Sequence, residues 1–390
     1  MTATVFLVAL CLRPAITAVG PLLPQISADE QLGEAAQGLL GALPLLAFAA
    51  VSPQVHRLSR RLGTERAVLL ALLVLAAGGV LRSYTGIAGL WAGTVVIGCA
   101  IAVGNVLVPA IVKRDYAGNV SRATGFYTAF ITLSAATASA LAVPIAGLAD
   151  WRLALAVWSL LALVVAVTWL PRTRSRPDHG PVAATASRPE AISVWRQPHA
   201  WLTTAFMGLQ STTFYVLVTW LPTIEIDGGV SARTAGVHLF LFQGMGILGG
   251  LAIPILLRTA RRRPTGAVVA SLPVLIAIVG LLAAPDLAVL WAAVAGLGQG
   301  AALVTALTLI SLGGRDHAET TRLSGMAQSL GYLLAASGPF LAGLLAEQTG
   351  TWKASLFLVA GFAALQVAAG AAAARAGRTA ELRRATTSPS

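Results

Sequence analysis

The stretch CLRPAITAVGPLLPQI, residues 11–26, places one arginine and three prolines inside an apolar run that opens almost at the first residue. Arg13 carries a guanidinium, which stays charged at any ordinary pH. Pro14, Pro21 and Pro24 each remove a backbone donor and disturb the preceding helical turn. In a membrane such groups are tolerated only where neighbouring helices, water or a ligand satisfy them. The stretch therefore predicts a bent membrane helix beside a cavity.

Composition indicates an integral membrane protein. Of 390 residues, 56% are hydrophobic and only 11% are charged, whereas soluble domains average about 25% charged residues. Twelve segments reach the roughly 20 apolar residues that a helix needs to cross a bilayer, and they lack the alternation of barrel strands. We expect an all-α membrane protein with twelve transmembrane helices, at residues 3–26, 35–55, 66–84, 89–112, 122–148, 152–170, 200–224, 234–257, 265–284, 287–312, 321–346 and 352–374.

The net charge of +12 is unevenly distributed along the chain. Arginines gather in alternate loops, most clearly 56–66, 171–199 and 258–264, while the loops between them are on balance acidic. Because Lys and Arg mark the cytoplasmic side of a membrane protein, we expect both termini in the cytoplasm and the helices in the plasma (inner) membrane. The positive charge then serves membrane orientation, and we expect no nucleic-acid partner.

The two halves of the chain repeat each other at an offset near 200 residues. Five sequence features recur in the same order, which indicates duplication of a six-helix unit. The pairs are Arg114-Asp115 with Arg315-Asp316, Arg122 and Gly125 with Arg322 and Gly325, Trp151-Arg152 with Trp352-Lys353, Leu23-Pro24 with Leu221-Pro222, and the basic turn 57–61 with 258–263.

The domain boundaries follow from this repeat. Residues 171–199 are rich in Pro, Ala, Ser and Arg, which is typical of a linker. We expect an N-terminal six-helix bundle at 1–170, a cytoplasmic linker at 171–199, a C-terminal six-helix bundle at 200–374 and a cytoplasmic tail at 375–390.

The chain lacks the residues that a nucleotide-driven pump, a metal site or an enzyme would need. Lys113 and Lys353 are the only lysines and neither follows a glycine, so the chain has no phosphate-binding loop for a primary pump. The five histidines have no metal-ligand spacing. All fifteen acidic residues fall in loops or at span ends. We therefore expect that the protein is not an enzyme and that it holds no metal and no cofactor.

Three motifs resemble one known group of transporters. They are LRPAITAVGPLLPQI at 12–26, PAIVKRDY at 109–116 and TWLPTIEIDGG at 219–229. With the twelve spans and the duplication, the whole chain resembles the cyanate/2-nitroimidazole transporter family (CynX/NimT) of the major facilitator superfamily. One departure is Cys11, where that family usually has Asn. The resemblance implies two six-helix bundles that move a small anion or small polar heteroaromatic compound by alternating access.

The basic loop after the second span also resembles the superfamily, whose motif there reads G-x-x-x-D-R-x-G-R. In this chain the loop reads HRLSRRLGTER, residues 56–66. Gly63 fits the motif and Arg61 lies in its basic part, but Arg60 occupies the Asp position. The resemblance therefore implies an altered charge lock between this loop and a helix.

Arg13 is the first candidate for a substrate contact. A charge near the middle of a span costs several kcal/mol unless it faces a cavity or a partner, and its fork of donors suits a planar anion or polar ligand. The alternative is a structural arginine that bonds backbone carbonyls freed by the prolines. Since no acidic residue lies inside a span, we favour the substrate anchor.

Other polar residues inside the spans are weaker candidates. Each could line a cavity or serve as a hydrogen bond between helices, worth about 0.6 kcal/mol. Gln210 and Tyr215 are favoured because the seventh span is the symmetry mate of the first. The full set of substrate-site candidates is Arg13, Asn105, Tyr127, Gln210, Tyr215, Gln243, Gln299, Gln328 and Tyr332.

A proton site and a gate are also candidates. Of the five histidines, only His238 falls within a predicted span. There it could titrate during proton coupling or pack as a neutral side chain. Pro21, Pro24 and Pro222 would bend the first and seventh spans, and Trp220 would close a gate or anchor at the bilayer interface.

The leading hypothesis is a monomeric secondary transporter for a small-molecule substrate, with the lipid bilayer as its environment and a proton as a candidate coupled ion. Within transport, the alternative is a proton-coupled multidrug exporter. A channel is the alternative from another class, although it needs a ring of filter groups. Single-channel currents would distinguish a channel from saturable transport.

Overall fold

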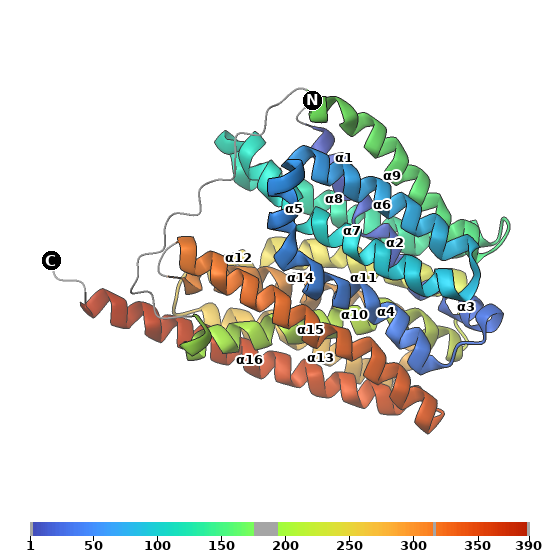
Figure 1. The fold of residues 1–390 in the computed structure, drawn as a ribbon. Coiled ribbons are helices and arrows are strands. Elements are labelled where there is room, and N and C mark those ends of the chain that lie inside the picture. The colour runs from blue at the N-terminus through green and yellow to red at the C-terminus, as the bar shows by residue number, and fades with distance from the viewer. Residues whose placement is uncertain (1–2, 175–193, 315–316, 388–390) are drawn as a thin grey trace.

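The computed structural model describes residues 3–174, 194–314 and 317–387 (Figure 1), and every element in this part of the chain is helical. The first half contains α1 (Thr4–Cys11), α2 (Pro14–Thr17), η1 (Gly20–Leu22), α3 (Leu23–Glu30), α4 (Glu34–Val51), η2 (Ser52–Gln54), α5 (Val55–Leu62), α6 (Thr64–Tyr84), α7 (Gly86–Asp115), η3 (Ala117–Asn119), α8 (Val120–Ala146) and α9 (Trp151–Arg174). The second half contains η4 (Val194–Arg196), α10 (Pro198–Asp227), α11 (Ala232–Ala252), α12 (Pro254–Leu257), α13 (Arg263–Ala283), η5 (Pro285–Leu287), α14 (Ala288–Gly313), α15 (His317–Thr349) and α16 (Trp352–Thr387).

Eleven helical segments of the described chain are long and apolar enough to cross a membrane. Helix α10, the expected seventh span, is not among these eleven segments, because it is less apolar than they are. It has 30 residues, about 45 Å at 1.5 Å per residue, but its middle carries Thr203, Thr204, Gln210, Ser211, Thr212 and Thr213, all buried. Because α10 packs against α14, α15 and α16, its polar side chains find partners inside the protein.

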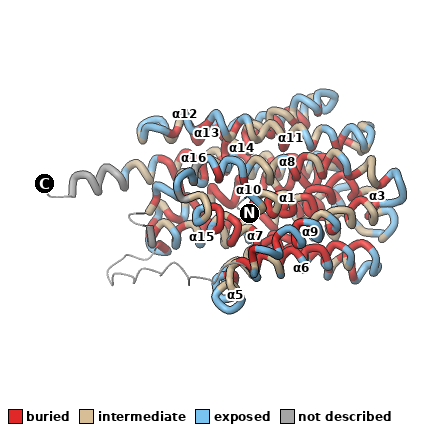
Figure 2. Tube along the Cα trace, turned by 90° about the horizontal axis from the view of Figure 1, so that it is seen from above, coloured by how far each residue is buried: buried red, intermediate tan, exposed pale blue. Residues whose placement is uncertain are grey.

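The helices form the two six-helix bundles of the expected fold. In Figure 1, α1, α6 and α9 lie towards the top and α13, α15 and α16 towards the bottom, with α4 and α11 between them. The bundles meet mainly where α4 packs on α15 and α8 packs on α11. Buried residues line the interior of both bundles (Figure 2), while large apolar side chains such as Leu160, Leu251 and Phe357 lie exposed on the outside.

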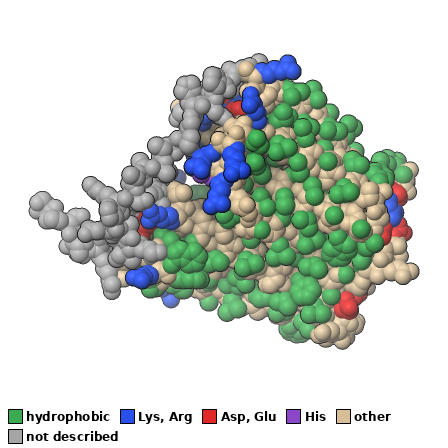
Figure 3. All heavy atoms as spheres, viewed as in Figure 1, with side chains coloured by type: hydrophobic (Ala, Val, Ile, Leu, Met, Phe, Trp, Pro, Cys, Tyr) green, Lys and Arg blue, Asp and Glu red, His purple; other side chains and the backbone are tan. Residues whose placement is uncertain are grey.

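The surface in Figure 3 divides along the helix axes. Hydrophobic side chains cover the middle, Lys and Arg side chains gather at the end that holds α5, and the acidic side chains lie mostly at the opposite end near α3. This is the charge pattern from which the sequence predicts cytoplasmic termini.

The first membrane span is broken, as the opening motif predicts. Helix α1 ends at Cys11, α2 begins at Pro14, and a further irregularity precedes η1 at Gly20. In the seventh span, α10 runs as one continuous helix through Pro222, so the expected bend there stays a prediction. A single proline leaves one carbonyl without its helical partner, and the packing of α10 on both bundles keeps the helix intact.

Equivalent residues of the two halves make equivalent contacts. The indole Nε1 of Trp151 donates to Asp29 Oδ2 at 2.9 Å, and that of Trp352 donates to Asp227 Oδ2 at 2.5 Å. Each pair fastens the start of a sixth helix to the end of the first helix of its own half. The repeat of Arg114-Asp115 at Arg315-Asp316 falls outside the described residues.

The predicted linker and tail are only partly described. Helix α9 continues to Arg174 and α10 begins at Pro198, so both ends of the range 171–199 are helical, while 175–193 lie outside the described residues. The range 375–390 continues α16 as far as Thr387. The boundaries 1–170, 200–374 and 375–390 stay predictions.

A charge lock forms at the end of the molecule that holds α5. Glu65 at the start of α6 pairs with Arg114 at the end of α7, and Arg172 of α9 pairs with Asp115 and lies 3.3 Å from Glu65 Oε1. Three helices are thereby fastened together by buried or half-buried ions. The lock in this chain therefore uses Glu65.

The residues of the loop motif precede this lock. Arg60 and Arg61 are exposed in α5. Gly63 ends α5 with φ +84°, in the left-handed region that favours glycine. The turn at Gly63 brings Glu65 onto the first turn of α6.

Candidate functional site

The candidate site lies at the break in the first span, where Arg13 reaches the opposite bundle. Arg13 precedes α2 with φ −121° and ψ −33°, outside the helical conformation. Its Nη1 donates to the Tyr215 hydroxyl of α10 at 2.6 Å, and its guanidinium carbon lies 6.0 Å from the centre of the Tyr215 ring. The two residues are 202 positions apart, so this hydrogen bond joins the two halves.

Two more predicted residues lie in the same core cluster as Tyr215. Tyr127 of α8 is buried in this cluster, and Tyr332 of α15 packs against it. Phe48 packs on Tyr332 with ring centres 5.5 Å apart, and Phe214 packs on Tyr215 at 5.1 Å. The structure thus brings together one cation and three phenols from four different spans. Within the described chain, no acidic side chain forms an ion pair with Arg13.

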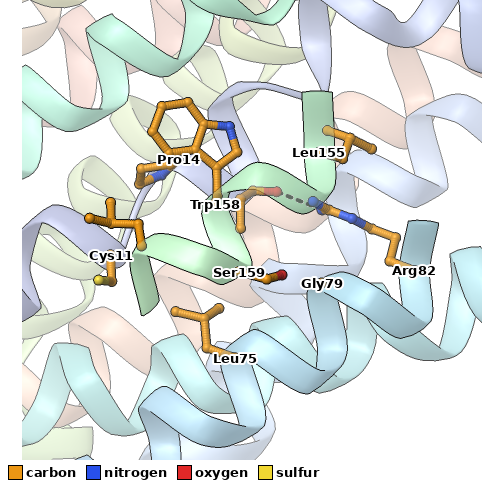
Figure 4. Close-up of a pocket in the computed structure, with 10 residues that line it drawn as sticks. Cys11, Pro14, Leu75, Gly79, Arg82, Leu155, Trp158 and Ser159 are labelled. Carbon is orange, nitrogen blue, oxygen red and sulfur yellow. Dashed lines mark hydrogen bonds between the residues drawn. The ribbon is translucent and has the colours of Figure 1, made fainter. Parts of the chain in front are cut away.

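A different arginine, Arg82, bonds a backbone carbonyl of the first span. Arg82, in the last turn of α6, is 2% exposed, and its Nη1 donates to the Ala15 carbonyl of α2 at 2.6 Å. That carbonyl is free because the amide of Val19 bonds to Ile16 O at 3.2 Å instead. Figure 4 shows Arg82 reaching from α6 to this carbonyl. Sequence reasoning missed Arg82, since its place at the end of a span is typical of a loop charge.

Three predicted glutamines are buried, but none contacts Arg13. Gln210 donates to the Ser211 hydroxyl at 2.7 Å within α10. The amide of Gln299 in α14 lies 2.8 Å from the Thr213 hydroxyl, which donates to Gln366 Oε1 of α16. These contacts fasten the C-terminal helices to one another.

Gln243 acts between the bundles instead. Its Nε2 donates to Ser139 Oγ at 2.7 Å and to Ala135 O at 3.2 Å, both on α8. Ser139 also donates to Thr17 O of α2 at 3.3 Å, and the Thr17 hydroxyl donates to Ala135 O at 3.0 Å. The network links α11 through α8 to the broken first span, one turn from Arg13.

The two remaining amide candidates are half-buried. Asn105 lies in α7, and the described residues provide no hydrogen-bond partner for its side chain. Gln328 of α15 donates to Ser324 Oγ of the same helix at 2.9 Å.

His238 has a partner that the sequence did not reveal. Its Nδ1 lies 3.0 Å from Glu225 Oε2, and the Glu225 side chain is 1% exposed. Glu225 falls just beyond the predicted span 200–224, but α10 continues to Asp227 and buries it against α11. Glu225 thus lies at a span end, as expected for an acidic residue, but it is buried there.

The gate candidates occupy two neighbouring regions. Pro21 lies in η1 and Pro24 in the first turn of α3. Trp220 is 0% exposed and its Nε1 donates to Pro339 O of α15 at 2.8 Å. It packs on Trp352 with ring centres 4.7 Å apart. An anchor at the bilayer interface is therefore the wrong interpretation for Trp220.

Comparison with known proteins fits this architecture. The family model described as the Major Facilitator Superfamily matches residues 5–336. The chain belongs to the major facilitator superfamily. It is 39% identical to the 2-nitroimidazole transporter of Escherichia coli (strain K12) over 362 residues, which cover 92% of this chain and 91% of that protein. These matches identify a multi-pass membrane transporter of the cyanate/2-nitroimidazole (CynX/NimT) type.

Two further comparisons agree with this placement in the superfamily. The chain is 27% identical to the cyanate transport protein CynX of Escherichia coli (strain K12) over 355 residues, which cover 90% of this chain and 91% of that protein. Among solved structures, a bacterial homologue of the human lysosomal transporter Spinster, in an inward-facing and unoccupied conformation, superposes with a TM-score of 0.80. That match covers 96% of each chain at 15% identity, so it supports the fold alone.

Proposed function

We propose that this member of the superfamily is a secondary transporter that moves a small anion or a small polar heteroaromatic compound across the plasma membrane by alternating access. The observation that carries the proposal is the bond from Arg13 to Tyr215 between the bundles. A substrate that takes over donors of Arg13 would contact both bundles at once. Its binding and release would then be coupled to the rocking of one bundle against the other.

The chemistry of the site supports this substrate class. A guanidinium without a carboxylate partner favours an anion or a nitro group, whose oxygens accept its planar fork of donors. The phenols of Tyr127, Tyr215 and Tyr332 add hydroxyl groups and flat ring faces, against which a heteroaromatic ring packs well. The names of the two Escherichia coli relatives, a 2-nitroimidazole transporter and a cyanate transport protein, cover both classes.

A proton is our proposed coupled ion, on a specific observation. A nearly buried carboxylate that faces a histidine at 3.0 Å forms a pair that a single proton can bridge. The pair Glu225–His238 joins α10 to α11, so loss of its proton would alter a contact inside the C-terminal bundle. This pair is also the observation that favours the alternative function, a proton-coupled multidrug exporter.

Binding and uptake by purified protein test the proposal. Wild-type protein in liposomes is given labelled 2-nitroimidazole or cyanate, and saturable uptake is measured beside affinity in detergent. Arg13→Ala should weaken affinity roughly ten- to a hundredfold, since a hydrogen bond to a charged group contributes about 1.5–3 kcal/mol. Arg13→Lys should restore it partly, because an ammonium lacks the planar fork.

The matched control is Arg66→Ala, which removes an exposed arginine from the first turn of α6. It should bind and transport as wild type does. Normal binding by Arg13→Ala, with the fold retained, would show that Arg13 is structural. Single-channel currents in place of saturable uptake would support a channel.

A further inference from the structure

A small cavity lies inside the N-terminal bundle, beside the break in the first span. Residues of α1, α2, α6 and α9 line it, among them Cys11, Pro14, Arg82, Trp158 and Ser159 (Figure 4). About 270 Å³ of empty space lies within its outline, part of it open to the surroundings, and the cavity has room for roughly one water-sized particle. It is separate from the Arg13 site, since none of its lining residues belongs to α8, α10 or α15.

The polar groups at this cavity are mostly donors without acceptors. Arg82 uses Nη1 for the Ala15 carbonyl, but its Nε and Nη2 have no hydrogen-bond partner in the protein. The indole Nε1 of Trp158, also buried, has none either. Ser159 adds a hydroxyl to the lining. Indole and guanidinium nitrogens only donate, so the occupant that suits them must accept.

The charge of Arg82 further limits which occupant suits the cavity. The Arg82 guanidinium is buried, and no acidic side chain in the described part of the chain forms an ion pair with it. A buried charge without a counter-charge is costly, and burial strengthens its attraction for an opposite charge. A water molecule supplies an acceptor but leaves the charge unbalanced. An anion supplies both.

We propose that the cavity between α6, α9 and the α1–α2 break binds one small monovalent anion of halide size, held by Arg82 and Trp158. The small volume excludes carboxylates and larger organic anions. Because the same guanidinium holds the Ala15 carbonyl, the anion would stabilise the bent form of the first span one turn beyond Arg13. This site is independent of the substrate proposed for Arg13.

The close packing of α6 on α9 supports a built site. A Cβ added at Gly79 would lie 2.1 Å from Ser159 Oγ, so the absence of a side chain there lets the two helices approach. One added at Gly93 of α7 would lie 2.5 Å from the backbone nitrogen of Arg82. The Arg82 backbone is therefore fixed from a third helix.

Thermal unfolding of the purified protein with chloride tests the proposal. Sodium chloride is compared with sodium gluconate at equal ionic strength, because gluconate is too large for the cavity. We expect chloride to raise the melting temperature of wild type along a saturating curve. Arg82→Met should weaken the apparent chloride affinity tenfold or more, and Trp158→Phe should weaken it several-fold.

Two matched variants locate the effect. Arg66→Met removes an exposed arginine from the same helix, α6, and should keep the chloride curve of wild type. Arg13→Ala should also keep it, which would separate this site from the substrate site. Identical curves in chloride and gluconate would overturn the proposal, and so would a chloride effect that is lost with Arg13 and kept without Arg82.

A direct measurement covers the case in which Arg82→Met does not fold. Crystals of the wild-type protein grown with sodium bromide should give an anomalous peak within hydrogen-bond distance of Arg82 Nε or Nη2 and of Trp158 Nε1. A well-ordered map with no bromide peak beside Arg82 refutes the site, whatever the variant does.

Discussion

The backbone of Gly20 packs directly on the carbonyl oxygen of Val218, so that a Cβ added at Gly20 would lie 2.3 Å from that oxygen. Pro222 explains why the oxygen is available, because proline lacks the amide that would bond to the carbonyl four residues earlier. The proline of the seventh span thus leaves a carbonyl facing the glycine of the first span. This is a contact between the bundles at the end of the molecule near α3.

We predict that Gly20→Ala separates the bundles at that end. Any side chain at Gly20 collides with fixed backbone, so the conformer in which the bundles meet there loses population. Nitroxide labels at the exposed residues Ala28 and Asp286, with the two native cysteines replaced by alanine, report the separation by electron paramagnetic resonance. The mean distance should grow by several ångströms. Gly361→Ala is the control, since nothing lies within 4 Å of its added Cβ, and equal distances in both variants would contradict the prediction.

The contact of Arg13 with Tyr215 predicts coupled effects on substrate affinity. Tyr215→Phe removes the hydroxyl that accepts from Arg13 and should weaken affinity less than Arg13→Ala does. In a double-mutant cycle the coupling energy should reach about 0.5–3 kcal/mol, as for residues in direct contact. Isothermal titration with 2-nitroimidazole or cyanate supplies the four affinities. Tyr84→Phe, at an exposed tyrosine, should change nothing, and strictly additive effects would argue that substrate does not replace this bond.

The Glu225–His238 pair predicts dependence of uptake on a pH gradient. Glu225→Gln and His238→Gln each remove a group that gains or loses a proton, so both should abolish stimulation by the gradient. Both should retain substrate binding, because the pair lies away from Arg13. Uptake into liposomes with and without an imposed gradient measures the effect, with the exposed Asp286→Asn as control. If the two variants respond to the gradient as wild type does, the pair carries no coupled proton.

The charge lock predicts that substitutions at two arginines differ greatly in their effect on the free energy of unfolding. Arg172→Met leaves Asp115 and Glu65 short of a positive partner in a largely buried site, where the Arg172 and Glu65 side chains are 8% and 7% exposed. Breaking a buried pair in this way costs about 3–5 kcal/mol. Arg60→Met changes an exposed residue and should stay within about 0.5 kcal/mol. Unfolding in detergent measures both, and similar midpoints would mean that the lock adds no stability.

The charge distribution predicts the orientation in the membrane. With basic loops on the cytoplasmic side, alkaline phosphatase fused after Ser390 should be inactive and green fluorescent protein fused there should fluoresce. Fusions after Asp286, in an expected outer loop, should give the opposite result. Phosphatase activity at the C-terminus would invert the proposed topology.

The sequence alone determined the fold class. Long apolar runs, alternating loop charge and a repeat near 200 residues are local or pairwise patterns. They are visible in the sequence without knowledge of the tertiary contacts. They predict the two six-helix bundles, and the prolines of residues 11–26 predict an irregular first span. They do not tell whether Pro222 interrupts the seventh span, where α10 is continuous, since the effect of a proline depends on what supports the neighbouring turns.

The partners of polar groups were decided only by the tertiary structure. One-dimensional patterns place Arg13 in a span, but they cannot tell that it bonds Tyr215, in one core cluster with Tyr127 and Tyr332, while Gln210 and Gln299 serve the C-terminal bundle. They place Arg82 and Glu225 at span ends, where charge is ordinary. Burial of these two follows from packing against helices distant in the sequence, and the energy of a buried charge depends on those neighbours.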